Sequence, residues 1–206
     1  MKIKALLDID GVIADFYLGF GNYLNKNIGT NLNLDNEQLE YSIYNWDHDL
    51  PQHIIDEEIP KWILNGGYAN IPIIKGAKQF VYKLMDKYDV YIVTARVGDF
   101  TLKMPGNIQD IIIKDTFKWF KKHGIPSDKL FFECKKVDFC KKYNIPIMIE
   151  DKLSTVIDAA NNGIRAILMD RNWNQDDSIR ENHYNIFVVY NYNDIFKILE
   201  LLTNES

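Results

Sequence analysis

The stretch Ile3-Lys4-Ala5-Leu6-Leu7-Asp8-Ile9-Asp10-Gly11-Val12 is an apolar run that stops at two aspartates. In a strand the side chains alternate, so Asp8 and Asp10 share one face and Ile9 points to the other. Two carboxylates that close repel each other unless a cation or a proton separates them. Gly11 lets the backbone leave the strand and approach a ligand closely. The stretch therefore predicts a strand that ends at a phosphate-transfer or metal site.

The composition limits the class of protein. The 206 residues suit one core domain with a sizeable insertion, and 47% of them are apolar. No apolar run approaches the roughly 18 residues of a membrane span, and the N-terminus lacks a signal pattern. Cys134 and Cys140 fit neither a CxxC zinc spacing nor a disulfide-rich secreted domain. Because no span or signal is found, we expect a soluble cytoplasmic protein that does not bind membranes. The net charge of −5 argues against binding of a nucleic-acid polymer.

Short apolar runs alternate with helical patterns along most of the chain. This order is typical of parallel strands joined by crossover helices, so we expect an α/β fold with a doubly wound parallel sheet. Gly124 and Gly163 are placed to end two of the helices. The predicted strands are 3–8, 90–94, 130–133, 147–151, 166–170 and 186–190, and the predicted helices are 75–88, 108–123, 154–162 and 192–202.

Residues 15–74 interrupt this rhythm. They lie between the first two strands, where an ordinary crossover needs far fewer residues. The segment reads as mostly helical and is rich in aromatic side chains. We therefore expect a small helical domain at 15–74, inserted into an α/β core that comprises 1–14 and 75–206.

Several polar residues fall at predicted strand ends, where ligands of doubly wound sheets bind. Asp8 is the better candidate for a nucleophile that forms an aspartyl-phosphate, because a strand end holds a carboxylate rigidly. Asp10 is placed to act as the general acid and base. The alternative is that the two aspartates only bind a metal or cap the turn.

The run Ile147-Met148-Ile149-Glu150-Asp151 is a second apolar strand that ends in acids. Asp8, the main-chain carbonyl of Asp10 and Asp151 would give the oxygen-only ligand shell that Mg²⁺ prefers. Glu150 would lie in that shell or just outside it. The alternative for Asp151 is a helix-capping role.

Phosphate contacts are predicted from Thr94, with a hydroxyl and the neighbouring main-chain N–H of Ala95, and from Gly11. Arg96 is either a substrate ligand or a surface salt-bridge partner. A lysine at the start of the next helical pattern, Lys136 or Lys135, would neutralise the nucleophile and the transferred phosphoryl group.

In order and spacing, the DxDGV motif at 8–12, Thr94, the lysine at 135 or 136 and Glu150-Asp151 resemble the four motifs of the haloacid dehalogenase superfamily of phosphohydrolases. The position of the insert resembles that of the 5′(3′)-deoxyribonucleotidases. So do the sequences around it and near the end of the chain, namely Asp15, Tyr44-Asn45-Trp46, Pro72-Ile73-Ile74-Lys75-Gly76-Ala77 and Asp170-Arg171-Asn172-Trp173-Asn174.

The resemblance implies a Rossmann-like core, a mobile helical cap, Mg²⁺ and removal of phosphate from nucleoside monophosphates. It assigns the role of nucleophile to Asp8 and that of general acid and base to Asp10. It assigns phosphate binding to Thr94 and Lys136. It assigns the metal to Asp8, Asp10 and Asp151. The chain departs from the family's pattern with Thr-Ala-Arg at 94–96 and with Glu-Asp at 150–151.

Aromatic residues of the insert are candidates for stacking on a nucleobase. The alternative is that a helical insert needs these rings for its own core. The candidates are Phe16, Phe20, Tyr44 and Trp46.

Other functions stay open at this point. The substrate could be a sugar phosphate or a nucleic-acid 3′-phosphate end, and a non-catalytic switch resembling a response-regulator receiver is a further alternative. The lysine precedes the last acid here, unlike in receivers, which disfavours the switch. The sequence leaves the oligomeric state open, with a homodimer as one option.

Overall fold

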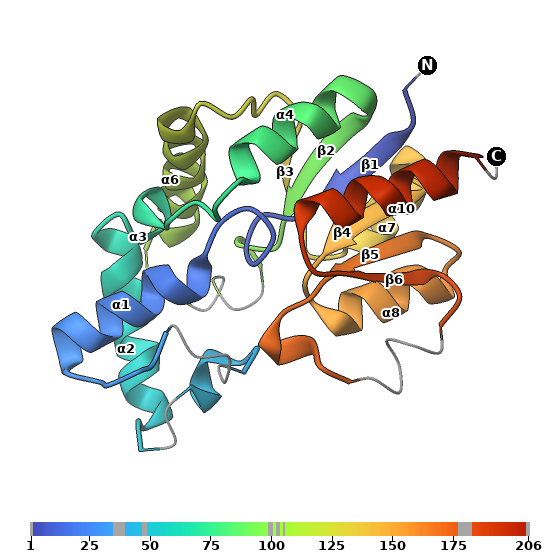
Figure 1. Cartoon of the computed structure of the whole chain (residues 1–206). Coiled ribbons are helices and arrows are strands. Elements are labelled where there is room, and N and C mark those ends of the chain that lie inside the picture. The colour runs from blue at the N-terminus through green and yellow to red at the C-terminus, as the bar shows by residue number, and fades with distance from the viewer. Residues whose placement is uncertain are drawn as a thin grey trace.

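The computed structural model describes residues 2–34, 40–46, 49–98, 101, 104, 106–176 and 183–204. Its centre is a six-stranded parallel sheet with the order β3-β2-β1-β4-β5-β6 (Figure 1). The strand order reverses at β1, which confirms the predicted doubly wound α/β fold. The strands are β1 (Lys4–Leu7), β2 (Asp89–Thr94), β3 (Leu130–Phe132), β4 (Ile147–Glu150), β5 (Arg165–Met169) and β6 (Ile186–Val189).

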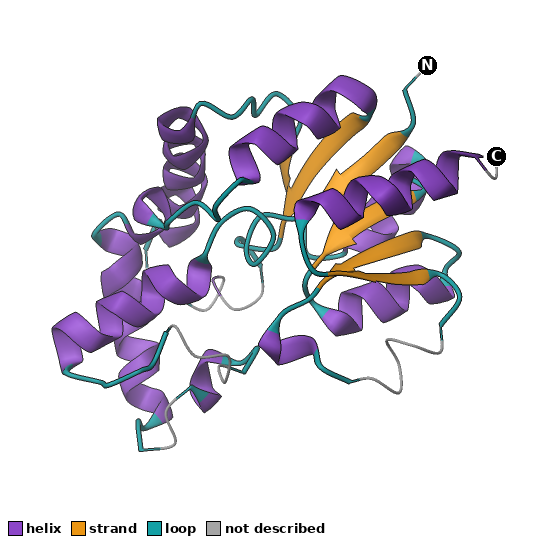
Figure 2. Ribbon diagram, in the orientation of Figure 1, coloured by secondary structure: helices purple, strands orange, loops and turns teal. Residues whose placement is uncertain are grey.

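Helices cover both faces of the sheet (Figure 2). Ala5 and Leu7 pack under α4 and α10, whereas Leu6 packs under α7 and α8, as the alternation of a strand requires. The core helices are α4 (Ala77–Lys87), α7 (Lys136–Tyr143), α8 (Leu153–Asn161) and α10 (Tyr192–Asn204). None of the helices in the described part of the chain is both long and apolar enough to span a membrane.

The insert forms a helical cap beside the sheet (Figure 1). It consists of α1 (Phe16–Ile28), the short 3₁₀ helix η1 (Ile43–Asn45), α2 (Gln52–Leu64) and α3 (Gly67–Asn70). Asp15 caps α1, because its Oδ1 accepts a hydrogen bond from the N–H of Leu18 at 2.9 Å.

The helix α6 (Ile108–His123) joins the cap, although it lies in the sequence range predicted for the core. It packs against α2 and α3, and the indole of Trp119 donates a hydrogen bond to the carbonyl of Ile71 at 2.7 Å. The cap therefore draws its helices from two separate parts of the chain.

Two adjacent segments connect the inserted helices α1, α2 and α3 to the core. The N–H of Asp15 donates to the carbonyl of Pro72 at 2.8 Å, and the N–H of Ile74 donates to the carbonyl of Ile13 at 3.0 Å. The first connection follows directly after Asp8 and Asp10 at the carboxyl end of β1, and the second runs beside it. The cap therefore begins next to the carboxyl end of β1.

Candidate active site

Three acidic side chains converge at the carboxyl ends of the two central strands. Asp8 follows β1 and lies beside β4, since its N–H donates to the carbonyl of Ile149 at 3.0 Å. Asp8, Glu150 and Asp151 each offer a carboxylate oxygen, and these oxygens lie within 4.8 Å of one another. All three side chains are buried. The distances allow Asp8 and Asp151 to share one cation.

Lys136 lies within this acidic cluster. Its Nζ is 2.6 Å from Oδ1 of Asp8 and 2.6 Å from Oε2 of Glu150. It is the first residue of α7, and that position aims its side chain at the strand ends. Lys135, the other candidate, is exposed at the N-cap of α7. The geometry thus selects Lys136 as the lysine of the site.

The charges of the cluster do not balance. Burial, and then the charge of Glu150, raise the pKa of Asp8 well above its ordinary value, and Lys136 offsets this only in part. Burial, Glu150 and Asp8 likewise raise the pKa of Asp151. Burial opposes ionisation of Glu150, but Lys136 outweighs it and lowers the pKa of that carboxyl. Burial also opposes the charge on Lys136, yet Asp8 and Glu150 raise its pKa.

A divalent cation would complete the cluster. Three ionised carboxylates and one ammonium group leave two negative charges uncompensated in a buried place. The donors are carboxylate oxygens, which suit Mg²⁺ better than softer metals. The residues present therefore fit a magnesium ion between Asp8 and Asp151, with Glu150 holding Lys136.

Gly11 makes room for Asp151. Its φ of +73° is in the left-handed region, and a Cβ added there would lie 2.0 Å from Oδ2 of Asp151. Any other residue at this position would push the carboxylate out of the cluster. This contact explains why a glycine follows Asp10 in the turn.

Asp10 is held by Arg96 rather than by the acidic cluster. Nε and Nη2 of Arg96 donate to Oδ2 and Oδ1 of Asp10, both at 2.7 Å. The guanidinium is buried, donates to Oγ1 of Thr116 on α6 at 3.2 Å, and lies 4.7 Å from the ring centre of Tyr68 on α3. The alternative of a surface salt bridge for Arg96 is therefore wrong. Burial opposes the charge of Arg96, but Asp10 raises the pKa of the guanidinium.

Thr94 ends β2 and is buried beside this pair. Its Oγ1 accepts a hydrogen bond from the N–H of Arg96 at 3.3 Å, and Ala95 between them is exposed. The hydroxyl is therefore fixed in a turn that follows the strand. This is the place that was predicted for a phosphate contact.

The cap aromatics differ in how much of each ring is accessible. Phe20 is fully buried in the cap, where other side chains enclose its ring. Trp46 is nearly buried, and its indole donates to the carbonyl of Glu40 at 2.8 Å. Tyr44 is half-buried, with its hydroxyl bonded to Asp56 at 2.6 Å. Phe16 is half-buried, and its ring centre lies 6.3 Å from that of Tyr68.

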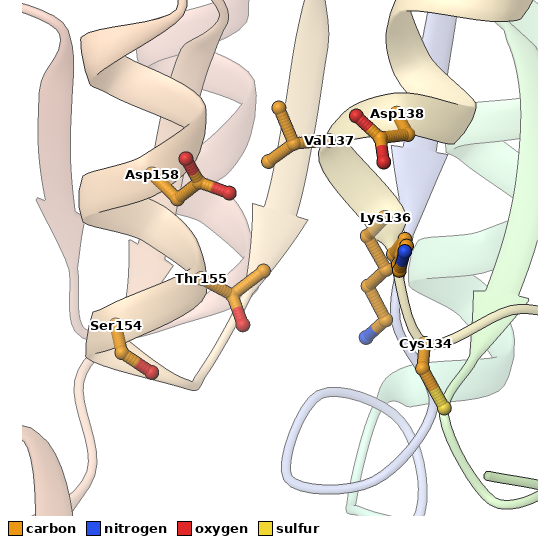
Figure 3. A pocket seen from close by; sticks show the side chains of 8 residues that line it. Cys134, Lys136, Val137, Asp138, Ser154, Thr155 and Asp158 are labelled. Carbon is orange, nitrogen blue, oxygen red and sulfur yellow. The ribbon is translucent and has the colours of Figure 1, made fainter. Parts of the chain in front are cut away.

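A pocket of about 310 Å³ adjoins the site between the first turns of α7 and α8 (Figure 3). Lys136 lines it with its stem, opposite Ser154 and Thr155. None of the three clustered acids lines this pocket, so it flanks the site without containing it.

The loop after β5, which contains the short 3₁₀ helix η2 (Asn172–Asn174), makes contacts with the site that were not predicted from the sequence. There Arg171, Trp173 and Asn174 donate hydrogen bonds to Gly11 and Asp151, and Trp173 also stacks on the cap. The segment stands out in the sequence only through the family resemblance, because an aromatic residue after a strand gives no indication of its partner.

Several solved structures share the fold of this chain. A haloacid dehalogenase-like hydrolase from Streptococcus pneumoniae is 15% identical over 96% of this chain and 98% of its own, with a TM-score of 0.62. A HAD-family hydrolase from Deinococcus radiodurans, with bound phosphate and sodium, is 12% identical over 95% and 94%, with a TM-score of 0.59. A HAD hydrolase from Bacillus subtilis, bound to magnesium, is 16% identical over 96% and 98%, with a TM-score of 0.55. No curated protein matches.

The chain has the fold of the haloacid dehalogenase hydrolases, and the family model that it matches makes it an enzyme that acts on phosphoric monoesters. Residues 2–194 match the family model described as "5′ nucleotidase, deoxy (Pyrimidine), cytosolic type C protein". The chain belongs to this family.

Proposed function

We propose that this protein is a magnesium-dependent nucleotidase that removes phosphate from deoxyribonucleoside monophosphates through an aspartyl-phosphate on Asp8. The observation that carries the proposal is the cluster in which Asp8, Asp151 and Lys136 meet at the ends of β1 and β4. The family description, which names deoxy 5′-nucleotidases, supports the substrate class, and its word "cytosolic" supports a cytoplasmic location.

Asp8 has the position of a nucleophile. Lys136 holds one of its oxygens at 2.6 Å, which fixes the carboxylate and offsets the negative charge that repels a phosphate dianion. Attack of Asp8 on phosphorus forms the acyl-phosphate as the bond to the nucleoside oxygen breaks. Water then attacks the same phosphorus, releases inorganic phosphate and restores the carboxylate.

Asp10 would transfer the protons of both steps. Its side chain is 27% exposed, so a leaving oxygen or a water molecule can reach it, whereas the Arg96 that holds it is buried. It would give a proton to the departing nucleoside oxygen and then take one from the attacking water. Thr94 and the N–H of Ala95 would hold the phosphate oxygens. The predicted contact from Gly11 is not carried further, because its N–H donates to the carbonyl of Ala14 at 2.9 Å.

Asp8 and Asp151 would hold the magnesium ion together with the main-chain carbonyl of Asp10. When bound, Mg²⁺ supplies positive charge that compensates the acids and the phosphoryl oxygens. The Deinococcus radiodurans hydrolase has bound phosphate and sodium and the Bacillus subtilis hydrolase has bound magnesium, which supports a cation and a phosphate as ligands of a protein with this fold.

Phe16 and Tyr44, whose rings are half-buried, are our first candidates for contact with the base. Trp46 is nearly buried and is the less accessible candidate. Phe16 is half-buried and lies against Tyr68, which itself contacts Arg96. The chain of contacts from Phe16 through Tyr68 to Arg96 supports a role for this ring near the substrate.

Phosphate release from all deoxy- and ribonucleoside monophosphates, with and without Mg²⁺, tests the proposal. Sugar phosphates and an oligonucleotide with a 3′-phosphate complete the panel. We expect the fastest magnesium-dependent release from deoxyribonucleotides, and none from the Asp8→Asn variant. Equally slow release from every nucleotide, with faster release from a sugar phosphate, would overturn the substrate class and keep the chemistry.

A further inference from the structure

The loop after β5 is bonded to the site through three of its side chains. Nε of Arg171 donates to the carbonyl of Gly11 at 2.8 Å, and Nε1 of Trp173 donates to Oδ2 of Asp151 at 2.9 Å. Nδ2 of Asn174, which is buried, donates to the carbonyl of Asp151 at 2.8 Å. The loop therefore fixes both the backbone and the side chain of Asp151.

The carboxylate of Asp151 is confined from two sides. The indole N–H of Trp173 binds Oδ2, and the backbone of Gly11 passes so close that an added Cβ would lie 2.0 Å from the same atom. Rotation of the carboxylate would break the hydrogen bond or bring an oxygen against the turn. A single orientation is thus imposed on this acid.

The other side of Trp173 contacts the cap. Its ring stacks on that of Tyr17 with the centroids 3.8 Å apart and the planes at 18°. Tyr17 belongs to α1, is nearly buried, and lies 5.0 Å from Trp46. In Figure 1 the turn that follows β5 extends from the sheet toward the cap. One side chain therefore touches both the cap and an acid of the cluster.

We propose that Trp173 is a positioning residue that couples the placement of the cap to the metal affinity of Asp151. The inference rests on the proposed magnesium dependence. A hydrogen-bond donor that orients a ligating group sets the affinity of the site, and its loss typically weakens metal binding about 10- to 100-fold. Stacking on Tyr17 holds the indole in the orientation that makes this bond.

In the first test, Mg²⁺ is titrated into the metal-free protein, and its Kd is measured by isothermal titration calorimetry. Trp173→Phe keeps an aromatic ring for the stack and removes the N–H donor. We expect its Kd for Mg²⁺ to rise about 10- to 100-fold. Trp119→Phe is the matched control, since it also removes a buried indole donor, bonded to the carbonyl of Ile71, and touches none of the acids. Its Kd should equal that of the wild type.

Equal Kd values for the wild type and Trp173→Phe, with the fold intact by circular dichroism, would overturn the positioning role. Failure of the wild type to bind Mg²⁺ would instead reject the proposed function, and the inference with it. The two failures are thus distinguishable in one experiment.

The second test addresses the coupling to the cap. Tyr17→Leu removes the stack without touching Asp151, and we expect weaker Mg²⁺ binding. The control variant Tyr17→Phe keeps the ring and loses only the hydrogen bond from the hydroxyl to the carbonyl of Tyr41. Its affinity for Mg²⁺ should equal that of the wild type. In the Trp173→Phe background, Tyr17→Leu should add no further loss. Wild-type affinity in Tyr17→Leu alone, or an additive loss in the double variant, would overturn the coupling.

Discussion

The strand-end cluster and the cap core are both buried, but their burial has different physical reasons. At the strand ends, Asp8, Lys136, Glu150 and Asp151 are each at most 6% exposed. Taking a charge out of water costs several kcal/mol even when it is paired. Packing alone therefore does not explain why these charged side chains are buried. In the cap, the rings of Phe20 and Trp62 are as deeply buried. Burial of apolar rings is favourable by itself.

This comparison shows where burial indicates function. A buried charge needs a chemical explanation, and the one that we propose at the strand ends is a cation and a phosphoryl group. A buried aromatic ring needs none, so the base-binding surface of the cap has to be sought among the half-buried rings. The predictions below change the buried charges at the strand ends, the Arg96 that lies between them and the cap, or the rings of the cap.

The largest effect is expected from Asp8→Asn. An amide cannot attack phosphorus to give the acyl-phosphate, so kcat should fall more than about 10³-fold. Lys136 keeps its partner Glu150, and the fold should persist by circular dichroism. Asp138→Asn, at an exposed acid of α7, is the control and should retain full activity. Unchanged phosphate release by Asp8→Asn would reject the nucleophile.

Removal of the metal comes next. A chelator should abolish phosphate release, and added Mg²⁺ should restore it. In the metal-free protein the pKa values of Asp8 and Asp151 are raised above the ordinary value of 3.8, so the folded state binds more protons than the unfolded state above that pH. Its stability should therefore fall as the pH rises through the raised values.

Mg²⁺ binds the ionised acids, so the rise in Tm that it causes should be larger at about pH 8 than at about pH 5. Glu150 has a lowered pKa and stays ionised over this range. Differential scanning fluorimetry with and without Mg²⁺ measures the difference. An equal rise in Tm at both values would contradict the proposed site of the cation.

Arg96→Met separates two roles of a buried charge. If Arg96 orients Asp10, the variant should lower kcat about 10²-fold or more with a small change in KM, since general acid–base catalysis contributes about 10²- to 10⁴-fold. If Arg96 mainly binds the substrate phosphate, KM should rise instead. Steady-state kinetics decide between the two. Arg96→Lys keeps the charge but not the two-pronged contact, so kcat should recover only in part.

The smallest effects are expected in the cap, where Phe16 and Phe20 make a matched pair. Phe16→Leu should raise KM for a deoxyribonucleotide at least about fivefold, because one stacked base is worth about 1–3 kcal/mol. It should leave hydrolysis of p-nitrophenyl phosphate, which has no base, unchanged. Phe20→Leu should lower the free energy of unfolding by about 1–2 kcal/mol and leave KM unchanged. The reverse pattern would move the base-binding role to Phe20.

Most of the core could be predicted from the sequence because local signals define it. All six strands coincide with short apolar runs, and α6 ends at His123 because Gly124 adopts the left-handed conformation. The family resemblance is confirmed by the family model, which matches residues 2–194. The strand-end positions of Asp8 and Asp151 followed from the same runs.

The remaining features depend on contacts between distant parts of the chain. The apolar face of α6 predicts a neighbour but not which one, and that neighbour is the cap. The pairing of Arg96 with Asp10 joins residues 86 positions apart, and Trp173 meets Asp151 across a crossover. The choice of Lys136 over Lys135 depends on the residue at which α7 begins, because this decides which of the two side chains points toward the strand ends. None of these contacts has a local signature.

A crystal structure with Mg²⁺ and beryllofluoride, a mimic of the transferred phosphoryl group, tests the central claim most directly. We predict beryllium bonded to a carboxylate oxygen of Asp8, Mg²⁺ bound by Asp8 and Asp151, and Lys136 beside the fluorides. Beryllofluoride on Asp10, or a cation outside the reach of Asp151, would contradict the account.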